Sequence, residues 1–208
     1  QKWLAPFFAI SINLFILGYF KYYNFFVDNI VTLLESFQIN TSFDTLKILL
    51  PVGISFYTFQ NIGYVVDVYR KKIEPCHNSI SYFVFVSFFP QLVAGPIERA
   101  SNLLPQIEKK RTFSMPLFVD GFFLISWGLF KKLVIADNVA LICNKIYLLN
   151  NPDPYLIFVG TLAFCIQIFA DFSAYTDIAR GSAKLLGFNL IQNFNNPYFS
   201  RNPSEFWQ

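Results

Sequence analysis

Long runs of apolar residues alternate with short polar stretches along this chain, a pattern that predicts several membrane-embedded helices. Residues 3–20 form the first run, and Lys21, Tyr22 and Tyr23 follow it. A lysine beside tyrosines is typical of the boundary between lipid and water, where both side chains anchor a helix. We therefore predict a spanning helix over residues 3–20 that ends at Lys21.

The next two segments differ in their polarity. Residues 28–44 place apolar side chains at helical spacing between polar ones, which predicts an amphipathic helix on the membrane surface. A second span is predicted from Leu46 to the basic cluster at residues 68–72, with Pro51 and Gly53 near its entry. Because basic residues favour the cytoplasmic side, this cluster is expected inside and residues 21–47 outside.

Residues 80–97 are apolar, but Pro90, Gly95 and Pro96 interrupt them before a regular helix could cross a membrane. The following segment, residues 99–111, is net basic, as is the segment before residue 80. Two basic flanks predict a re-entrant segment, which is tolerated only where protein or water surrounds its irregular backbone. An ordinary kinked span is the alternative.

Residues 117–147 combine an apolar first half with a polar stripe. Lys131, Asn138 and Lys145 are spaced seven residues apart, so a helix would place them on one face. Such a helix could lie along the interface or line a cavity. A solvated face, with lysines that extend toward the headgroups, is equally consistent with the pattern.

The last apolar run, residues 155–170, continues without a linker into a stretch that contains Asp171, Asp177 and Arg180. A charge at bilayer depth costs about 2.5 to 3.5 kcal/mol, so such side chains face a protein interior, a water-filled cavity or one another. On one helix the two aspartates point about 120° apart and do not converge. Asp177 and Arg180 are close enough to neutralise each other, and both a structural pair and a functional role remain open.

The composition supports a membrane protein and excludes other classes. Of 208 residues, 54% are hydrophobic, 20% aromatic and only 14% charged, against about 25% charged in soluble domains. The net charge of +3, without a basic stripe, argues against nucleic-acid binding. Cys76, Cys143 and Cys165 are too few and too far apart for a zinc site or a disulfide framework, and no metal site is predicted.

The single histidine of the chain is not expected to act as a catalytic base. His77 lies in a polar loop beside the basic cluster, and we predict that it is a surface residue. The chain lacks an initiator methionine at Gln1 and reaches Gln208 without a terminating signal. We therefore expect residues 1–208 to be part of a single transmembrane domain that is truncated at both ends, with any histidine base located beyond Gln208.

Several motifs, in order along about three quarters of the chain, resemble the membrane-bound O-acyltransferase family, and specifically its bacterial alginate and polysaccharide O-acetyltransferase branch. No single motif is specific, whereas the ordered set is. The motifs occupy residues 51–60, 66–70, 88–97, 128–132, 135–138, 167–179 and 193–198. One departure is Ala174, which stands where the family usually has glycine and so weakens the expectation of close packing there.

The resemblance implies an all-α fold, a polytopic helical membrane bundle with a re-entrant segment. It also implies an enzyme of the bacterial inner membrane that moves an acyl group, commonly acetyl, from a cytoplasmic donor to hydroxyls of an exported polysaccharide. No cofactor is expected to stay bound; the donor would be a molecule such as acetyl-CoA. The expected partners are membrane lipid, the donor, and either the polysaccharide or a soluble extracytoplasmic protein that accepts the acyl group. In this family, residues 204–207 would precede an Arg-Trp-His motif, and the essential histidine would lie further on.

Transfer between a donor on one side and a hydroxyl on the other requires a polar passage through the bundle. We predict that polar or helix-breaking residues inside apolar runs line this tunnel: Gln91, Gly95, Pro96, Gln167, Asp171, Tyr175 and Asp177. A transporter or channel is the competing hypothesis, but it predicts an inverted repeat, and the sequence shows none. A catalytically silent membrane scaffold is a third possibility.

Overall fold

The computed structural model describes residues 3–39, 49–92, 95–193 and 197–206, and these ranges contain helices and irregular segments but no β-strand. The prediction of an all-α fold is confirmed. The chain divides into two compact units, one formed by Gln1–Phe88 with Arg99–Leu104 and the other by Phe89–Glu98 with Pro105–Gln208.

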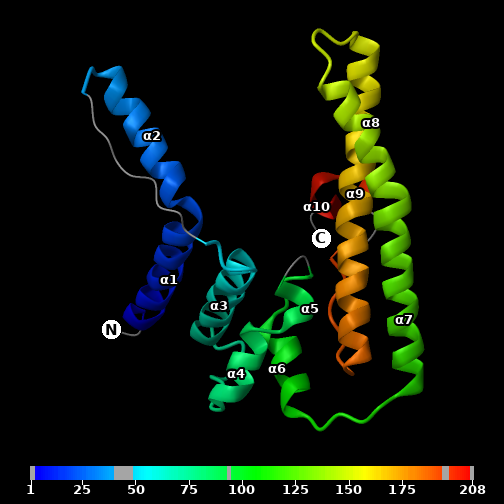
Figure 1. Cartoon of the computed structure of the whole chain (residues 1–208). Coiled ribbons are helices and arrows are strands. Elements are labelled where there is room, and N and C mark those ends of the chain that lie inside the picture. Colours follow the sequence, from blue (N-terminus) through cyan, green and yellow to red (C-terminus); the bar gives the residue numbers. More distant parts are fainter. Residues whose placement is uncertain (1–2, 40–48, 93–94, 194–196, 207–208) are drawn as a thin grey trace. The chain divides into compact units, whose positions relative to one another are not determined.

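The first unit begins with one continuous helix (Figure 1), in which α1 (Leu4–Leu17) passes through the π-helical turn η1 (Gly18–Tyr22) into α2 (Tyr23–Ser36). The prediction that the helix ends at Lys21 is therefore wrong. Lys21 Nζ donates a hydrogen bond to Ser55 Oγ at 2.9 Å, so a neighbouring segment satisfies its polar head without a break in the helix. Of the predicted amphipathic segment, residues 40–44 lie outside the described residues.

Helix α3 (Ile54–Tyr69) begins later than the predicted start at Leu46, which itself lies outside the described residues. Pro51 precedes it, and Gly53 adopts a left-handed conformation with φ of 76°. Because a proline lacks the N–H that helical bonding needs and only glycine adopts this φ without strain, the helix starts after both residues. Within the first unit, Asn61 Nδ2 donates to Asn13 Oδ1 at 3.3 Å and so connects α3 to α1.

The predicted interruption of the third apolar segment is confirmed. Helix α4 (Ser79–Val86) ends before Pro90, and the short α5 (Phe89–Leu92) and α6 (Ala100–Glu108) follow as separate helices. Asn78 caps α4 by accepting a hydrogen bond from the Ile80 backbone N–H at 2.9 Å. Residues 93–94 lie outside the described residues, and re-entry from one side of a membrane stays a prediction.

The second unit is built on a pair of long helices (Figure 1). The first helix is continuous through α7 (Met115–Phe130), the π-helical turn η2 (Lys131–Ala136) and α8 (Asp137–Tyr147). Its partner is α9 (Pro154–Leu185), a helix of 32 residues that packs against α7, η2 and α8. The predicted continuity of the last apolar run with its polar continuation is therefore confirmed.

Local sequence explains both ends of α9. The Asp153 side chain accepts a hydrogen bond from the Tyr155 N–H at 2.8 Å, and Pro154 occupies the first turn, where its missing N–H has no cost. At the other end, Gly187 has φ of 81°, and the Phe188 N–H donates to the Ala183 carbonyl at 2.9 Å. This is the glycine-terminated arrangement that satisfies the last carbonyls of a helix.

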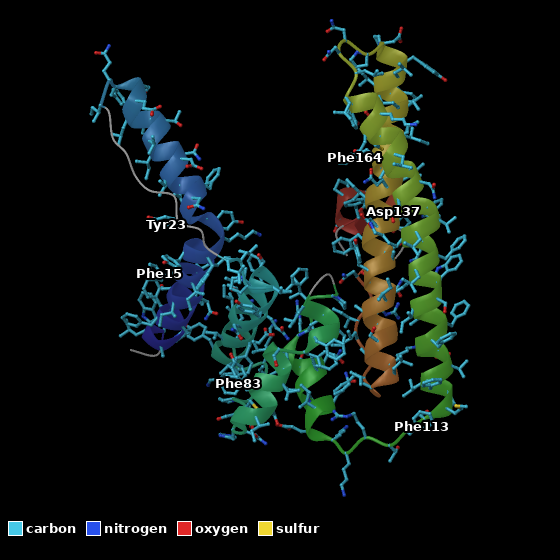
Figure 2. All side chains as sticks on the ribbon, in the orientation of Figure 1. Phe15, Tyr23, Phe83, Phe113, Asp137 and Phe164 are labelled. Atoms are coloured by element: carbon cyan, nitrogen blue, oxygen red, sulfur yellow. The ribbon has the colours of Figure 1, made fainter. Side chains whose placement is uncertain are left out.

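Two helices among the described residues, Leu4–Ser36 and Pro154–Leu185, are long and apolar enough to cross a membrane. Their outward faces carry large apolar side chains, such as Phe15, which is 73% exposed, and Phe158, which is 61% exposed. Figure 2 shows such side chains around α1, where Phe15 is labelled. Apolar surface of this extent is suited to contact with lipid and supports association of the chain with a membrane. The described residues end with the short helices η3 (Pro197–Phe199) and α10 (Pro203–Phe206).

Candidate functional site

Two adjacent lysines of η2 face α9, and each binds a different aspartate. Lys131 Nζ lies 2.7 Å from Asp177 Oδ2 and 3.0 Å from Ser173 Oγ. The side chains of Lys131 and Asp177 are only 14% and 15% exposed. Arg180 Nη1 lies 3.7 Å from Asp177 Oδ1, so the predicted pair with Arg180 is present, but the closest cation to Asp177 is Lys131.

Lys132 binds the second aspartate of α9. Its Nζ lies 2.9 Å from Asp171 Oδ1 and 2.8 Å from Asp137 Oδ1, and it is 5.4 Å from the centroid of the Tyr175 ring. Asp137, labelled in Figure 2, belongs to the first turn of α8. The charges that the sequence places within apolar runs are therefore neutralised by one another, as the cost of a charge in lipid requires.

Both lysines belong to the π-helical turn η2. Consecutive residues of an α-helix point about 100° apart, and Asp171 and Asp177 point about 120° apart on α9. A π-helical turn is wider than an α-helical one, and such turns occur frequently at functional sites. It also ends the regular stripe expected from Lys131 and Asn138: Asn138 is exposed, and its Nδ2 donates to the Val134 carbonyl of its own helix at 2.8 Å.

A cavity of about 260 Å³ opens beside the Lys131–Asp177 pair. Polar and aromatic side chains from α7, η2, α9 and the segment after α9 share its wall: Trp127, Lys131, Phe169, Ser173, Thr176, Asp177 and Gln192. The Asn193 side chain donates to Thr176 Oγ1 at 3.2 Å, which holds the segment after α9 against this wall. Lys131 donates and Asp177 accepts, so the wall offers both kinds of hydrogen-bonding group to a polar, uncharged molecule.

The structure separates the predicted tunnel residues into groups. Asp177 lines the cavity, whereas Asp171 and Tyr175 surround Lys132, and Gln167 is a half-buried residue of α9 outside the cavity wall. Gln91, Gly95 and Pro96 are buried in the second unit. A Cβ on Gly95 would lie 3.1 Å from Ala179 Cβ, so this segment packs closely on α9. That these seven residues line one passage stays a prediction.

Sequence reasoning placed Lys131 on a polar stripe that could line a cavity, and Lys131 does line one. It did not pair Lys131 or Lys132 with the aspartates of α9, although two lysines that interrupt an apolar run could have indicated such partners. Glu98 is only 2% exposed and accepts a hydrogen bond from the Ile191 backbone N–H. Nothing in the sequence indicates this contact, because it joins residues 93 positions apart. His77 is exposed, as predicted.

Comparison with known proteins gives relatives along the whole chain, although no protein-family profile matches it. The chain is 40% identical over all 208 residues to a Pseudomonas aeruginosa protein named "Probable alginate O-acetylase AlgI", of which it covers 39%. It is 33% identical, over 94% of its length, to a Helicobacter pylori peptidoglycan O-acetyltransferase, of which it covers 41%. It is 29% identical, over 75% of its length, to a Bacillus subtilis teichoic acid D-alanyltransferase, of which it covers 40%. The chain thus spans about two fifths of the length of these relatives.

Proposed function

We propose that this chain, which belongs to the membrane-bound O-acyltransferase family, is part of an enzyme that transfers an acyl group to hydroxyls of an exported or cell-surface polysaccharide. The relatives are named for acyl transfer to three kinds of polymer, and the group named is acetyl in two of them. Acetyl is therefore the proposed group, and acetyl-CoA on the cytoplasmic side the proposed donor. The proposed acceptor is the polysaccharide itself or a soluble protein outside the membrane that passes the acyl group on.

The single observation that carries this proposal is the polar cavity beside a neutralised lysine–aspartate cluster in a pair of apolar helices. An acceptor hydroxyl that leaves water loses hydrogen bonds, and the loss is costly unless the protein replaces them. Lys131, Ser173, Thr176, Asp177 and Gln192 can replace them from the cavity wall. We propose that this cavity forms part of the passage along which a hydroxyl reaches the acyl donor.

Transfer to a hydroxyl also needs a group that takes its proton. Lys131 and Asp177 are already bound to each other, and the lone histidine, His77, is an exposed residue outside the unit that contains the cavity. We propose that a histidine beyond Gln208 supplies this base and that the cluster positions and desolvates the reacting groups.

The enzyme is proposed to cross the bacterial inner membrane several times, with residues 68–72 and 99–111 on the cytoplasmic side.

The pairing of the carboxylates argues against a transporter or channel. A carboxylate that binds a transported cation must be able to exchange its partner for that ion. Asp177 contacts both Lys131 and Arg180, and Asp171 contacts Lys132. Basic side chains of the protein itself therefore already neutralise both aspartates. This arrangement favours a permanent polar structure over an ion pathway.

The test uses membranes that contain the full-length protein, labelled acetyl-CoA and a de-O-acetylated polysaccharide. We expect label in the polymer with the wild-type protein and at least a fivefold lower rate with Asp171→Asn at equal protein level, because Lys132 loses a charged partner. The matched control is Asp28→Asn, since Asp28 is an exposed aspartate of α2.

Each outcome decides a separate point. Failure of the wild-type membranes to label any polysaccharide would overturn the proposed donor and reaction. Full activity of Asp171→Asn would leave the reaction standing but would remove Asp171 from the functional site. An equal loss in Asp28→Asn would attribute the effect to a general response of the membrane protein to the loss of a carboxylate.

A further inference from the structure

A second cavity lies at the end of the helix pair, where α7 begins and α9 stops. Its volume is about 220 Å³. The lining residues that matter for its chemistry are two cations, a hydroxyl and three apolar side chains: Arg111, Lys184, Ser114, Phe113, Phe118 and Leu186. Lys184 follows Asp177 by two helical turns, so this cavity is distinct from the one beside Lys131.

Arg111 is held in place by three contacts. Its side-chain stem packs against Gly187, where an added Cβ would lie 3.5 Å from Arg111 Cδ. Its guanidinium lies 4.2 Å from the centroid of the Phe188 ring, and Nη1 donates to the Gln106 carbonyl at 3.1 Å. A guanidinium has five N–H donors, so this hydrogen bond leaves capacity for an anion. An arginine fixed in this way loses little further entropy when it binds a phosphate.

Lys184 supplies the second positive charge. Its Nζ lies 3.2 Å from Asp120 Oδ2, but the Asp120 side chain is 62% exposed and is not part of the cavity wall. An ion pair this exposed is worth about 0 to 1 kcal/mol, so Lys184 can turn toward a stronger anion at little cost. Arg111, Lys184 and Asp120 together carry a charge of +1, and none of the residues that line the cavity is acidic.

The position of the cavity identifies the source of the anion. The apolar helix Pro154–Leu185 ends at the cavity, and the wall is partly apolar and open, with Phe113 75% and Leu186 45% exposed. Figure 2 labels Phe113 in the segment that leads into α7. Basic and aromatic side chains at the end of an apolar helix lie at the level of lipid headgroups.

We propose that this cavity binds the phosphate group of an anionic phospholipid through Arg111 and Lys184. The acyl chains of the lipid then extend along exposed apolar residues of α7, which continue from the cavity as Phe118, Phe122 and Phe123. A soluble phosphate has the same headgroup chemistry but no use for these apolar surfaces, so the two sources can be separated by experiment.

The test measures lipid binding to the full-length protein, purified and placed in bilayer discs. Discs of phosphatidylcholine alone are compared with discs that also contain phosphatidylglycerol, and lipid that stays bound after extraction is counted by native mass spectrometry. We expect selective retention of phosphatidylglycerol by the wild type. Arg111→Gln and Lys184→Gln should each weaken it about fivefold, since one basic residue at a membrane surface contributes about 1 kcal/mol.

The matched control is Lys110→Gln, which removes the same charge from the residue before Arg111 but does not touch the cavity wall. It should leave selective retention unchanged. Arg111→Lys, which keeps the charge but not the fork geometry, should fall between wild type and Arg111→Gln. If Arg111→Gln does not fold, Lys184→Gln and the comparison of lipids on the wild type carry the test.

Three results would overturn the proposal. One is equal retention of phosphatidylcholine and phosphatidylglycerol by the wild type. Another is an equal loss of binding in Lys110→Gln, which would indicate general attraction to a negative surface. The third is displacement of the bound lipid by inorganic phosphate or coenzyme A at millimolar concentration, which would assign the cavity to a soluble phosphate compound.

Discussion

Asp177→Ala is expected to destabilise the full-length protein by about 2 to 3 kcal/mol, because it leaves the Lys131 ammonium in a mostly buried place without its carboxylate. Removal of one partner from a fully buried ion pair costs about 3 to 5 kcal/mol of stability, and the 14% exposure of Lys131 lowers that figure. Arg180 also loses its contact with Asp177. The change is measured as a lower unfolding temperature in bilayer discs and a lower protein level in membranes.

Two further variants test whether the loss of stability in Asp177→Ala comes from the burial of the Lys131 charge. Asp120→Ala removes the exposed partner of Lys184 and should cost less than 1 kcal/mol. The double variant Lys131→Met/Asp177→Leu removes both charges and should recover most of the lost stability, since apolar residues can replace a buried pair at little or no cost. A loss in Asp177→Ala no larger than that in Asp120→Ala would show that the Lys131–Asp177 pair is effectively solvated.

Helix ends that depend on local chemistry could be predicted from the sequence. Pro90 and its neighbours indicated the break between α4 and α5. Such signals are local, because a proline lacks the N–H that helical bonding needs and a glycine tolerates a left-handed φ. Lys21 misled because the helix continues past it: Lys21 is exposed, and its Nζ donates a hydrogen bond to Ser55 Oγ without a break in the backbone.

The candidate site could be predicted only in part. Asp171 and Asp177 were found because a carboxylate in an apolar run requires a partner, and that requirement is local. Which partner each aspartate has depends on how α9 packs against η2, and a π-helical turn leaves no mark in a hydrophobic pattern of period 3.6. Trp127 and Gln192 were missed because one looks like a membrane aromatic and the other follows the end of a helix.

The lysine–aspartate distances depend on how closely α7 and α9 approach, and glycines set that approach. A Cβ on Gly181 would lie 2.6 Å from the Gly121 carbonyl oxygen, and a Cβ on Gly128 would lie 2.8 Å from the Ala174 carbonyl oxygen. Small residues that let backbones touch are the usual basis of helix association in membranes. The weaker packing expected from Ala174 is not observed, because Ala174 is fully buried and Gly128 provides the space opposite it.

Gly181→Ala should therefore destabilise the protein by about 2 to 3 kcal/mol, the upper part of the range for overpacking, because two of the three nearest atoms, the Gly121 carbonyl oxygen and the Ile125 nitrogen, are backbone and cannot turn aside. Gly63→Ala is the matched control: Gly63 lies in α3, and an added Cβ there meets nothing within 4 Å. That change should stabilise α3 by up to about 1 kcal/mol, since alanine loses less backbone entropy in a helix.

The same variant links packing to the proposed activity. Wider separation of α7 and α9 in Gly181→Ala would lengthen the 2.7 Å contact between Lys131 and Asp177, so transfer of label to the polysaccharide should fall with stability. Gly63→Ala should retain both the stability and the transfer of label. Unchanged stability and transfer in Gly181→Ala would mean that the helices accommodate a methyl group without moving, and the glycines would then have no part in setting the charged cluster.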